Sequence, residues 1–161
     1  MKTVRIITLH LAYGGIEKAV CQMANLFAEK YDVEIISVYD MPDAPAFPID
    51  ERVCVRYLLD EIPNRDEWRD CARRKDVFGL ARESVKAARI LHDKKKAVID
   101  AISAIDEGVI ITTRPEHNVL LSKYGRPGVY KLGQLHQDHC FDKKLLDSFR
   151  RDYGGLDAFI L

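Results

Sequence analysis

The first 38 residues constrain the fold more than any other part of this sequence, because an apolar run meets two glycines and a helical pattern begins at once. The run Val4–Leu9 ("VRIITL") is typical of a strand buried on both faces of a parallel sheet. After Gly14-Gly15, apolar residues recur at helical spacing over Ile16–Lys30, and Val33–Val38 ("VEIISV") is a second such strand. The pattern predicts a strand–helix–strand unit with a right-handed crossover.

The same alternation of strands and helices continues along the chain. We expect further strands over Val53–Leu58, Gly108–Thr113, Val129–His136 and the final "LDAFIL", and further helices over Asn64–Asp76, Val77–Ile105, Glu116–Tyr124 and Phe141–Tyr153. The run Lys94–Lys96 marks an expected break in the long helix. This order predicts an α/β fold, a Rossmann-like three-layer sandwich with a mainly parallel sheet. Because the chain ends inside an apolar strand, we expect residues 1–161 to be a fragment.

Composition excludes several classes of protein. Among the 161 residues, 25 basic and 25 acidic side chains cancel, so no overall charge favours nucleic acid as a partner. No stretch approaches the ~18 apolar residues of a membrane-spanning helix, and the N-terminus lacks a signal-peptide pattern. The four cysteines are widely spaced without a CxxC pair, which is typical of reduced thiols. We therefore expect a cytoplasmic protein.

The two glycines lie where a ligand is expected. In an open parallel sheet, ligands bind beyond the carboxyl ends of the strands, and Gly14-Gly15 follows the first strand there. The helix that begins next has unpaired N–H groups, which favour an anion, and glycine lets a ligand approach the backbone. The alternative is a tight turn whose glycines serve geometry alone. Neither the GxGxxG dinucleotide fingerprint nor the GxxxxGK[ST] phosphate loop is present.

The stretch "GGIEKAVCQMANLFAEKYDVEIISVY" resembles the opening of glycosyltransferase family 4, where a GG loop, a Gly-Gly-Ile-Glu-[Arg/Lys] helix start and a "VEIISV" strand follow one another. The resemblance returns at "DEGVIITTRPEHNVLL" and at "KLGQLHQDH…LLDSFRRDYGGLDAFIL", and it weakens over residues 40–107. It implies one half of a two-domain glycosyltransferase B fold. By this resemblance the chain is the N-terminal, acceptor-side domain, without the C-terminal donor-binding domain that carries the family's Glu-x7-Glu motif.

The resemblance also implies a site. Gly14 and Gly15 match the loop that faces the phosphates of the donor, a nucleotide-diphosphate sugar such as a UDP-sugar. His136, the candidate catalytic residue, matches the family histidine that contacts the donor sugar near the reacting carbon. Imidazole offers a hydrogen-bond donor and an acceptor, which sugar hydroxyls need. The alternative for His136 is a histidine paired with a backbone carbonyl.

Other residues at this edge are candidates for substrate binding. Arg114 suits a phosphate or a sugar hydroxyl, and its alternative is an ion pair with Glu116 at a helix start. Glu17 and Lys18 lie in the first helical turn, close to the expected ligand, although Glu17 also favours the helix dipole without one. For His139 two interpretations stay open, a place in the acceptor groove and a solvated loop.

The segment "HQDHC" brings His136, His139 and Cys140 close together in the sequence, as in a zinc site. Structural zinc needs four ligands, usually in two spaced pairs, and the sequence offers no second pair. We expect no metal ion and no cofactor.

The long helix combines a basic and an apolar face. Arg82, Lys86 and Arg89 share one face, which the run Lys94–Lys96 extends. The expected apolar face consists of Val77, Ala81, Val85 and Ala88. Basic amphipathic segments bind anionic membrane surfaces. A peripheral contact with the inner face of the membrane is one interpretation, and a solvated helix face is the other.

The combined features predict a retaining hexosyltransferase that moves a sugar from a nucleotide-diphosphate donor to a hydroxyl of a glycan, lipid or cell-wall polymer. The resemblance points to bacterial teichoic-acid or capsular polysaccharide synthesis and implies the retaining outcome. The isolated fragment is expected to be inactive.

Two alternatives to this function stay open. One is another Rossmann-like nucleotide-binding enzyme such as an oxidoreductase, for which Asp40 ends the second strand but the glycine fingerprint is missing. The other is a non-catalytic binding module.

Overall fold

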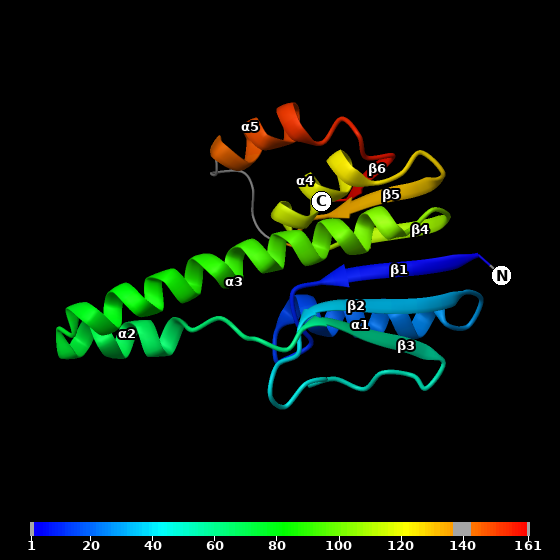
Figure 1. The fold of residues 1–161 in the computed structure, drawn as a ribbon. Helices are drawn as coiled ribbons and strands as arrows, with labels where there is room; N and C mark the ends of the chain where they lie inside the picture. The colour runs from blue at the N-terminus through cyan, green and yellow to red at the C-terminus, as the bar shows by residue number, and fades with distance from the viewer. Residues whose placement is uncertain (1, 137–142, 161) are drawn as a thin grey trace.

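The computed structural model describes residues 2–136 and 143–160, and it confirms the α/β prediction. In this part of the chain, the elements follow in the order β1 (Thr3–Thr8), α1 (Gly15–Phe27), β2 (Asp32–Tyr39), β3 (Val53–Leu59), α2 (Arg65–Arg74), α3 (Val77–Ala104), β4 (Gly108–Thr112), α4 (Pro115–Tyr124), β5 (Val129–Gln134), α5 (Lys143–Asp152) and β6 (Ala158–Ile160). All six strands pair in parallel in the order β3-β2-β1-β4-β5-β6. Their carboxyl ends therefore lie at one edge of the sheet (Figure 1).

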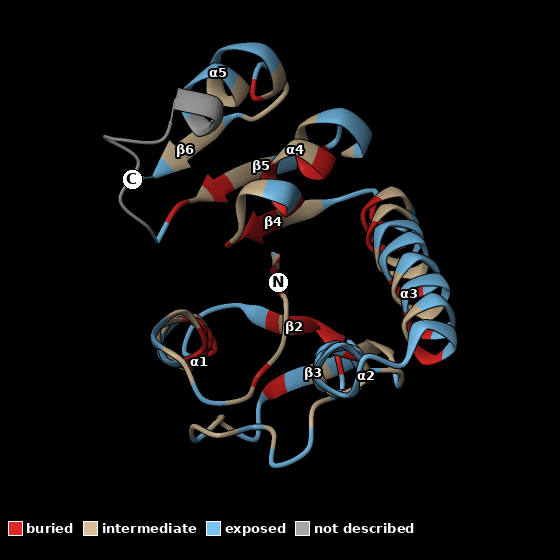
Figure 2. Ribbon diagram, turned by 90° about the vertical axis from the view of Figure 1, so that its left-hand side faces the viewer, coloured by how far each residue is buried: buried red, intermediate tan, exposed pale blue. Residues whose placement is uncertain are grey.

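At the centres of β1 and β2, consecutive residues are apolar because both faces of the sheet are covered there. Successive residues of a strand point to opposite faces. Ile6 pairs with Ile35 and is buried against α1, whereas the next residue, Ile7, pairs with Ile36 and is buried against α3 and α4. None of these four side chains is exposed. Figure 2 shows α1 and α3 on opposite sides of the sheet, which gives the predicted three layers.

The long helix α3 runs without a break from Val77 to Ala104, so the predicted break at Lys94–Lys96 is wrong. Its buried side continues past the lysines, because Ile90, Val98 and Ile102 pack in one cluster against the sheet. Three consecutive lysines are compatible with a helix whose other faces reach solvent.

Together, α2 and the first half of α3 form an arm that projects beyond the carboxyl ends of the strands (Figure 1). The apolar face expected on this half of α3 is wrong, because Val77 and Val85 are 73% and 72% exposed and Ala81 and Ala88 are exposed too. The side that is buried instead carries Gly79, Glu83 and Ile90. Among the described residues beyond the sheet edge, α2 packs against α3, and it covers the side that carries Gly79 and Glu83.

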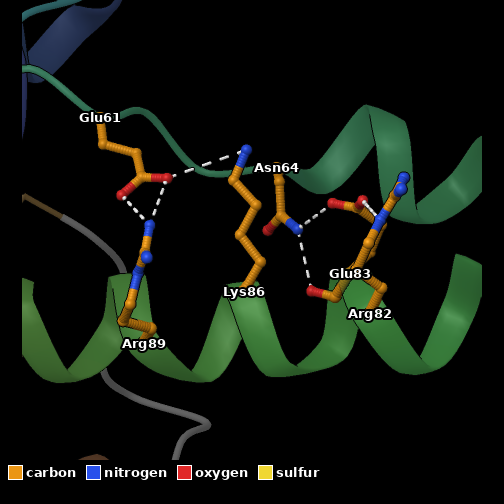
Figure 3. A network of polar contacts seen from close by, with 6 residues as sticks. All are labelled: Glu61, Asn64, Arg82, Glu83, Lys86 and Arg89. Atoms are coloured by element: carbon orange, nitrogen blue, oxygen red, sulfur yellow. Dashed lines mark hydrogen bonds and ion pairs between the residues drawn. The ribbon is translucent and has the colours of Figure 1, made fainter.

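A polar network fastens the base of this arm to the segment that precedes α2 (Figure 3). Asn64, which is buried, donates from Nδ2 to the Glu83 carbonyl at 2.9 Å and to its Oε2 at 2.8 Å. Arg89 donates to both carboxylate oxygens of Glu61, at 3.0 and 2.8 Å. Lys86 lies 3.8 Å from the same carboxylate. The basic face predicted on α3 is thus largely paired with acidic residues.

Candidate functional site

The carboxyl ends of β1 and β4 form the point at which the sheet reverses its direction of winding. The chain leaves β1 into α1 on one face, and it leaves β4 into α4 on the other. Open α/β sheets bind ligands at such a point, because the loops after the two strands diverge there. The loop after β1 carries Gly14 and Gly15, and Arg114 follows β4, so these predicted site residues share this point.

The two glycines differ in their surroundings. Gly14 precedes α1 in an extended conformation, and its carbonyl accepts from the N–H of Lys18 at 3.0 Å. A Cβ on Gly14 would collide with the carboxylate of Glu17, whereas a Cβ on Gly15 would meet nothing within 4 Å. Because Gly14 has no side chain to cap α1, the first N–H groups of the helix keep their hydrogen-bonding capacity. Gly15 is therefore the part of the loop with open space beside its backbone.

Arg114 binds Glu17 across the point of reversal. Its Nη2 donates to Glu17 Oε1 at 2.9 Å, and the side chains are 26% and 4% exposed respectively. The alternative ion pair of Arg114 with Glu116 is wrong, because Glu116 accepts from Lys94 of α3 at 3.2 Å instead. Arg114 precedes α4 in an extended conformation, whereas Glu116 lies within the helix that faces α3. The buried Glu17 carboxylate therefore fixes the position of the Arg114 guanidinium.

His10 completes this cluster, and sequence reasoning missed it. Its Nδ1 lies 3.6 Å from Glu17 Oε1, and the side chain is 23% exposed. Burial lowers the pKa of His10 below 6.5, Glu17 opposes this effect and Arg114 adds to it, so the imidazole is mainly neutral at pH 7. The only sequence signal was its place in the loop after β1.

His136 lies two residues beyond the end of β5, so the predicted strand was too long. The side chain is exposed, and its Nε2 lies 3.2 Å from Oε1 of Gln134. Gln134 also donates to Sδ of Met23 on α1 at 3.5 Å. His136 therefore contacts the side chain of Gln134, which reaches the same face of the sheet as α1. His139 lies outside the described residues, and Lys18 is exposed on the first turn of α1.

Asn118 was also missed, and it joins the ends of two strands. Its Oδ1 accepts from Thr112 at the end of β4 at 2.6 Å, and its Nδ2 donates to the carbonyl of Gln134 at the end of β5 at 3.0 Å. The Asn118 side chain is fully buried. This bridge fixes the sheet edge from which both Arg114 and His136 extend.

Within residues 2–136 and 143–160, no group of three acidic, histidine or cysteine side chains is placed to bind a metal ion. Cys21, Cys54 and Cys71 are free thiols. In the same described segments, no helix is both long and apolar enough to span a bilayer.

Comparison with known proteins places this chain beside one curated relative. No family model matches the chain. Over 153 aligned residues, the chain is 33% identical to a protein of Streptomyces coelicolor that is named exopolysaccharide phosphotransferase. The alignment covers 86% of this chain and 15% of the relative. The chain is thus similar to one segment of a much longer protein.

Proposed function

We propose that this chain is the acceptor-side domain of a bacterial sugar transferase that builds a cell-surface polysaccharide from a nucleotide-diphosphate sugar. The observation that carries the proposal is the meeting of the open Gly15 backbone, the start of α1 and Arg114 at the point of reversal. The name of the Streptomyces relative supports a transferase of polysaccharide synthesis. The resemblance to glycosyltransferase family 4 supports sugar transfer with retention of configuration.

The proposed site binds the donor diphosphate by charge. N–H groups at the start of α1 favour the negative charge, and the absence of a side chain at Gly15 leaves room for it. Arg114 is held by Glu17 through Nη2 at 2.9 Å, and its Nε has no partner among the described residues, so Nε–H donates to a phosphate oxygen in this proposal. Stabilisation of the departing diphosphate is the main chemical demand of sugar transfer.

The remaining candidates act on the sugar and the acceptor in this proposal. His136 is exposed beyond β5 and orients a sugar hydroxyl, and Lys18 adds a charge on the first turn of α1. His139 belongs to the acceptor side. Glu116 is engaged with Lys94 on the other face, so we assign it no contact with the donor. A second domain provides the other donor contacts, which makes the isolated chain inactive.

Thermal unfolding in the presence of nucleotides tests this proposal. UDP or a UDP-hexose should raise the Tm of the intact protein that includes the proposed second domain, because a ligand that binds only the folded state stabilises it. Stabilisation by NAD instead would favour an oxidoreductase, and no effect of either would favour a non-catalytic module. Gly15→Val should remove the UDP effect without lowering the Tm of the free protein. Gly154→Val is the matched control, because a Cβ there also meets nothing within 4 Å.

A second candidate reaction is transfer of a sugar phosphate, which the name of the relative favours. Attack on the anomeric carbon of a UDP-sugar releases UDP, whereas attack on its sugar-linked phosphorus releases UMP and leaves the phosphate on the product. Identification of the nucleotide that the intact protein releases separates the two reactions. UDP supports our primary proposal and UMP supports phosphotransfer.

We also propose a peripheral membrane contact at the tip of the arm. Phe78 and Val77 are 90% and 73% exposed there, and Arg73, Arg74 and Lys75 precede them in the chain. Apolar side chains beside basic ones favour an anionic bilayer surface. Flotation with phosphatidylglycerol vesicles, but not phosphatidylcholine vesicles, should recover the protein, and Phe78→Asp should abolish recovery.

A further inference from the structure

Two cavities of about 440 Å³ each border Leu91 of α3, on the α3 side of the sheet. Neither is lined by a residue of the GG loop. One of them lies at the base of the arm, and its volume is within the range of small-molecule sites, roughly 300–1,000 Å³. This cavity, here called the arm cleft, has a lining that includes Tyr39, Asn64, Arg65, Trp68, Arg69 and Leu91. Tyr39 ends β2, so the arm cleft opens at the carboxyl edge of the sheet.

Trp68 is held in a fixed orientation in the arm cleft. Its Nε1 donates to Oγ of Ser84 on α3 at 3.0 Å, which favours one orientation of the indole. The residue is nevertheless 42% exposed. A half-exposed aromatic ring whose polar atom is already paired presents its face for contact with C–H groups, and such a contact loses little side-chain entropy.

Two arginines share the arm cleft with Trp68. Arg65 and Arg69 are one helical turn apart on α2, so their side chains lie on the same face. Arg65 forms no ion pair with any described residue, and Arg69 lies 4.0 Å from Asp66, whose side chain is 95% exposed. Such a long, solvated pair holds the guanidinium weakly. Both arginines are therefore available to a carboxylate or phosphate.

The base of the arm holds these groups in place before any ligand binds. Asn64, the residue before α2, is fixed to Glu83 by two hydrogen bonds, and Glu61 is fixed to Arg89 (Figure 3). The spacing of α2 and α3 is thus set by the buried contacts of Asn64 with Glu83 and by the exposed pair of Glu61 with Arg89. A preformed cleft with an aromatic face and two cations matches a ligand that is apolar on one face and anionic on its rim.

From this geometry we infer that the arm cleft binds an anionic saccharide, with the C–H face of one sugar ring on Trp68 and its carboxylate or phosphate on Arg65 and Arg69. This inference goes beyond the proposed transfer reaction, which concerns the donor at the GG loop, and it is tested without catalysis.

Trp68 is the only tryptophan of the chain, so its fluorescence reports on the arm cleft directly. A mannuronate tetrasaccharide should change the Trp68 emission in a saturable manner, and added salt should weaken the effect. Maltotetraose, which is neutral, and inorganic phosphate alone should each bind at least about tenfold more weakly, since neither makes both the ring contact and the charge-assisted hydrogen bonds.

A pair of double variants separates the arm cleft from general attraction to a basic helix. Arg65→Gln/Arg69→Gln should weaken mannuronate binding about tenfold or more. Arg73→Gln/Arg74→Gln removes the same charge from the far end of α2 and should leave binding unchanged. Equal effects of the two variants, equal binding of maltotetraose, or no saturable signal would each overturn the inference. The UDP-dependent Tm shift should be unchanged in both variants, so failure here is distinguishable from failure of the donor site.

Discussion

The guanidinium of Arg114 donates to the carboxylate of Glu17 at 2.9 Å, although 97 residues separate them in the sequence. The contact joins the first turn of α1 to the end of β4, from which the next helix turns to the opposite face. Gly14 allows it, because a side chain there would occupy the space of the Glu17 carboxylate. One ion pair thus ties together the two loops of the candidate site.

Arg114→Gln should destabilise the protein more than Glu17→Gln. Loss of Arg114 leaves a carboxylate buried without its cation, whereas loss of the Glu17 charge leaves a guanidinium that is 26% exposed and hydrated. We expect a decrease of about 1–3 kcal/mol in the free energy of unfolding for Arg114→Gln, and less than about 1 kcal/mol for Glu17→Gln. Urea denaturation measures both, and equal values would contradict the buried-charge explanation.

Gly14→Ala and Gly15→Ala should have opposite effects on stability. The new methyl group of Gly14→Ala displaces the buried Glu17 carboxylate, so we expect a loss of about 1 kcal/mol or more. Gly15→Ala fills open space at the first helical residue and should be neutral or stabilising by up to about 1 kcal/mol. Thermal unfolding of both variants tests this, and destabilisation by Gly15→Ala would show that the space beside it is occupied.

Asn118→Leu should destabilise the protein by about 2–4 kcal/mol. The variant removes hydrogen bonds to Thr112 and to the carbonyl of Gln134, and both partners are left without them inside the protein. Glu61→Gln is a suitable control, because it weakens an exposed ion pair with Arg89 and should cost less than about 1 kcal/mol. A small effect of Asn118→Leu on the urea midpoint would argue against the bridge between β4 and β5.

The stability of the protein should fall in mild acid because of His117. Burial lowers the pKa of this fully buried imidazole from 6.5 to about 4; nearby Glu116 opposes the change, and Lys94 and Arg114 add to it. Between these two values the unfolded chain binds the proton and the folded chain does not, so the free energy of unfolding decreases as the pH falls. We expect His117 to contribute about 1–2 kcal/mol of this loss between pH 7 and pH 5.

His117→Leu isolates that contribution. Neither ring nitrogen of His117 has a hydrogen-bond partner among the described residues, so an apolar replacement should be tolerated at pH 7. The variant should lose less stability than the natural protein between pH 7 and pH 5, while His10, whose pKa is also lowered, affects both proteins equally. Identical pH profiles would show that His117 is not the titrating group.

Local sequence patterns predicted the elements of this fold well, because each buried strand and each amphipathic helix carries its own periodicity. The consecutive residues Ile6-Ile7 and Ile35-Ile36 are fully buried, and adjacent apolar residues are the pattern of strands covered on both faces. The pattern failed on the first half of α3. Its apolar stripe at Val77 and Val85 faces solvent, since a periodicity identifies a face but not the neighbour that covers it.

The candidate site was predicted in part. Gly14 and Gly15 predicted a loop followed by the start of a helix, and this loop lies at the expected edge of the sheet. Of the two interpretations of Arg114, the pair with Glu116 was wrong, because a sequence suggests partners that are close in the chain and Glu17 is distant in it. His10 had no signal beyond its place in the loop after β1, and Asn118 had none, since the partners of each lie on other strands and helices.

By itself, the sequence determined the strands, the helices and the turn that places two glycines before α1, because these depend on residues close together in the chain. Only the tertiary structure decided that β1 lies beside β4, that Arg114 meets Glu17 and that the arm leaves Trp68 half exposed over a cleft. Those relationships depend on which strand becomes the neighbour of which. That choice follows from burial of both faces of the whole sheet and has no counterpart in any local pattern.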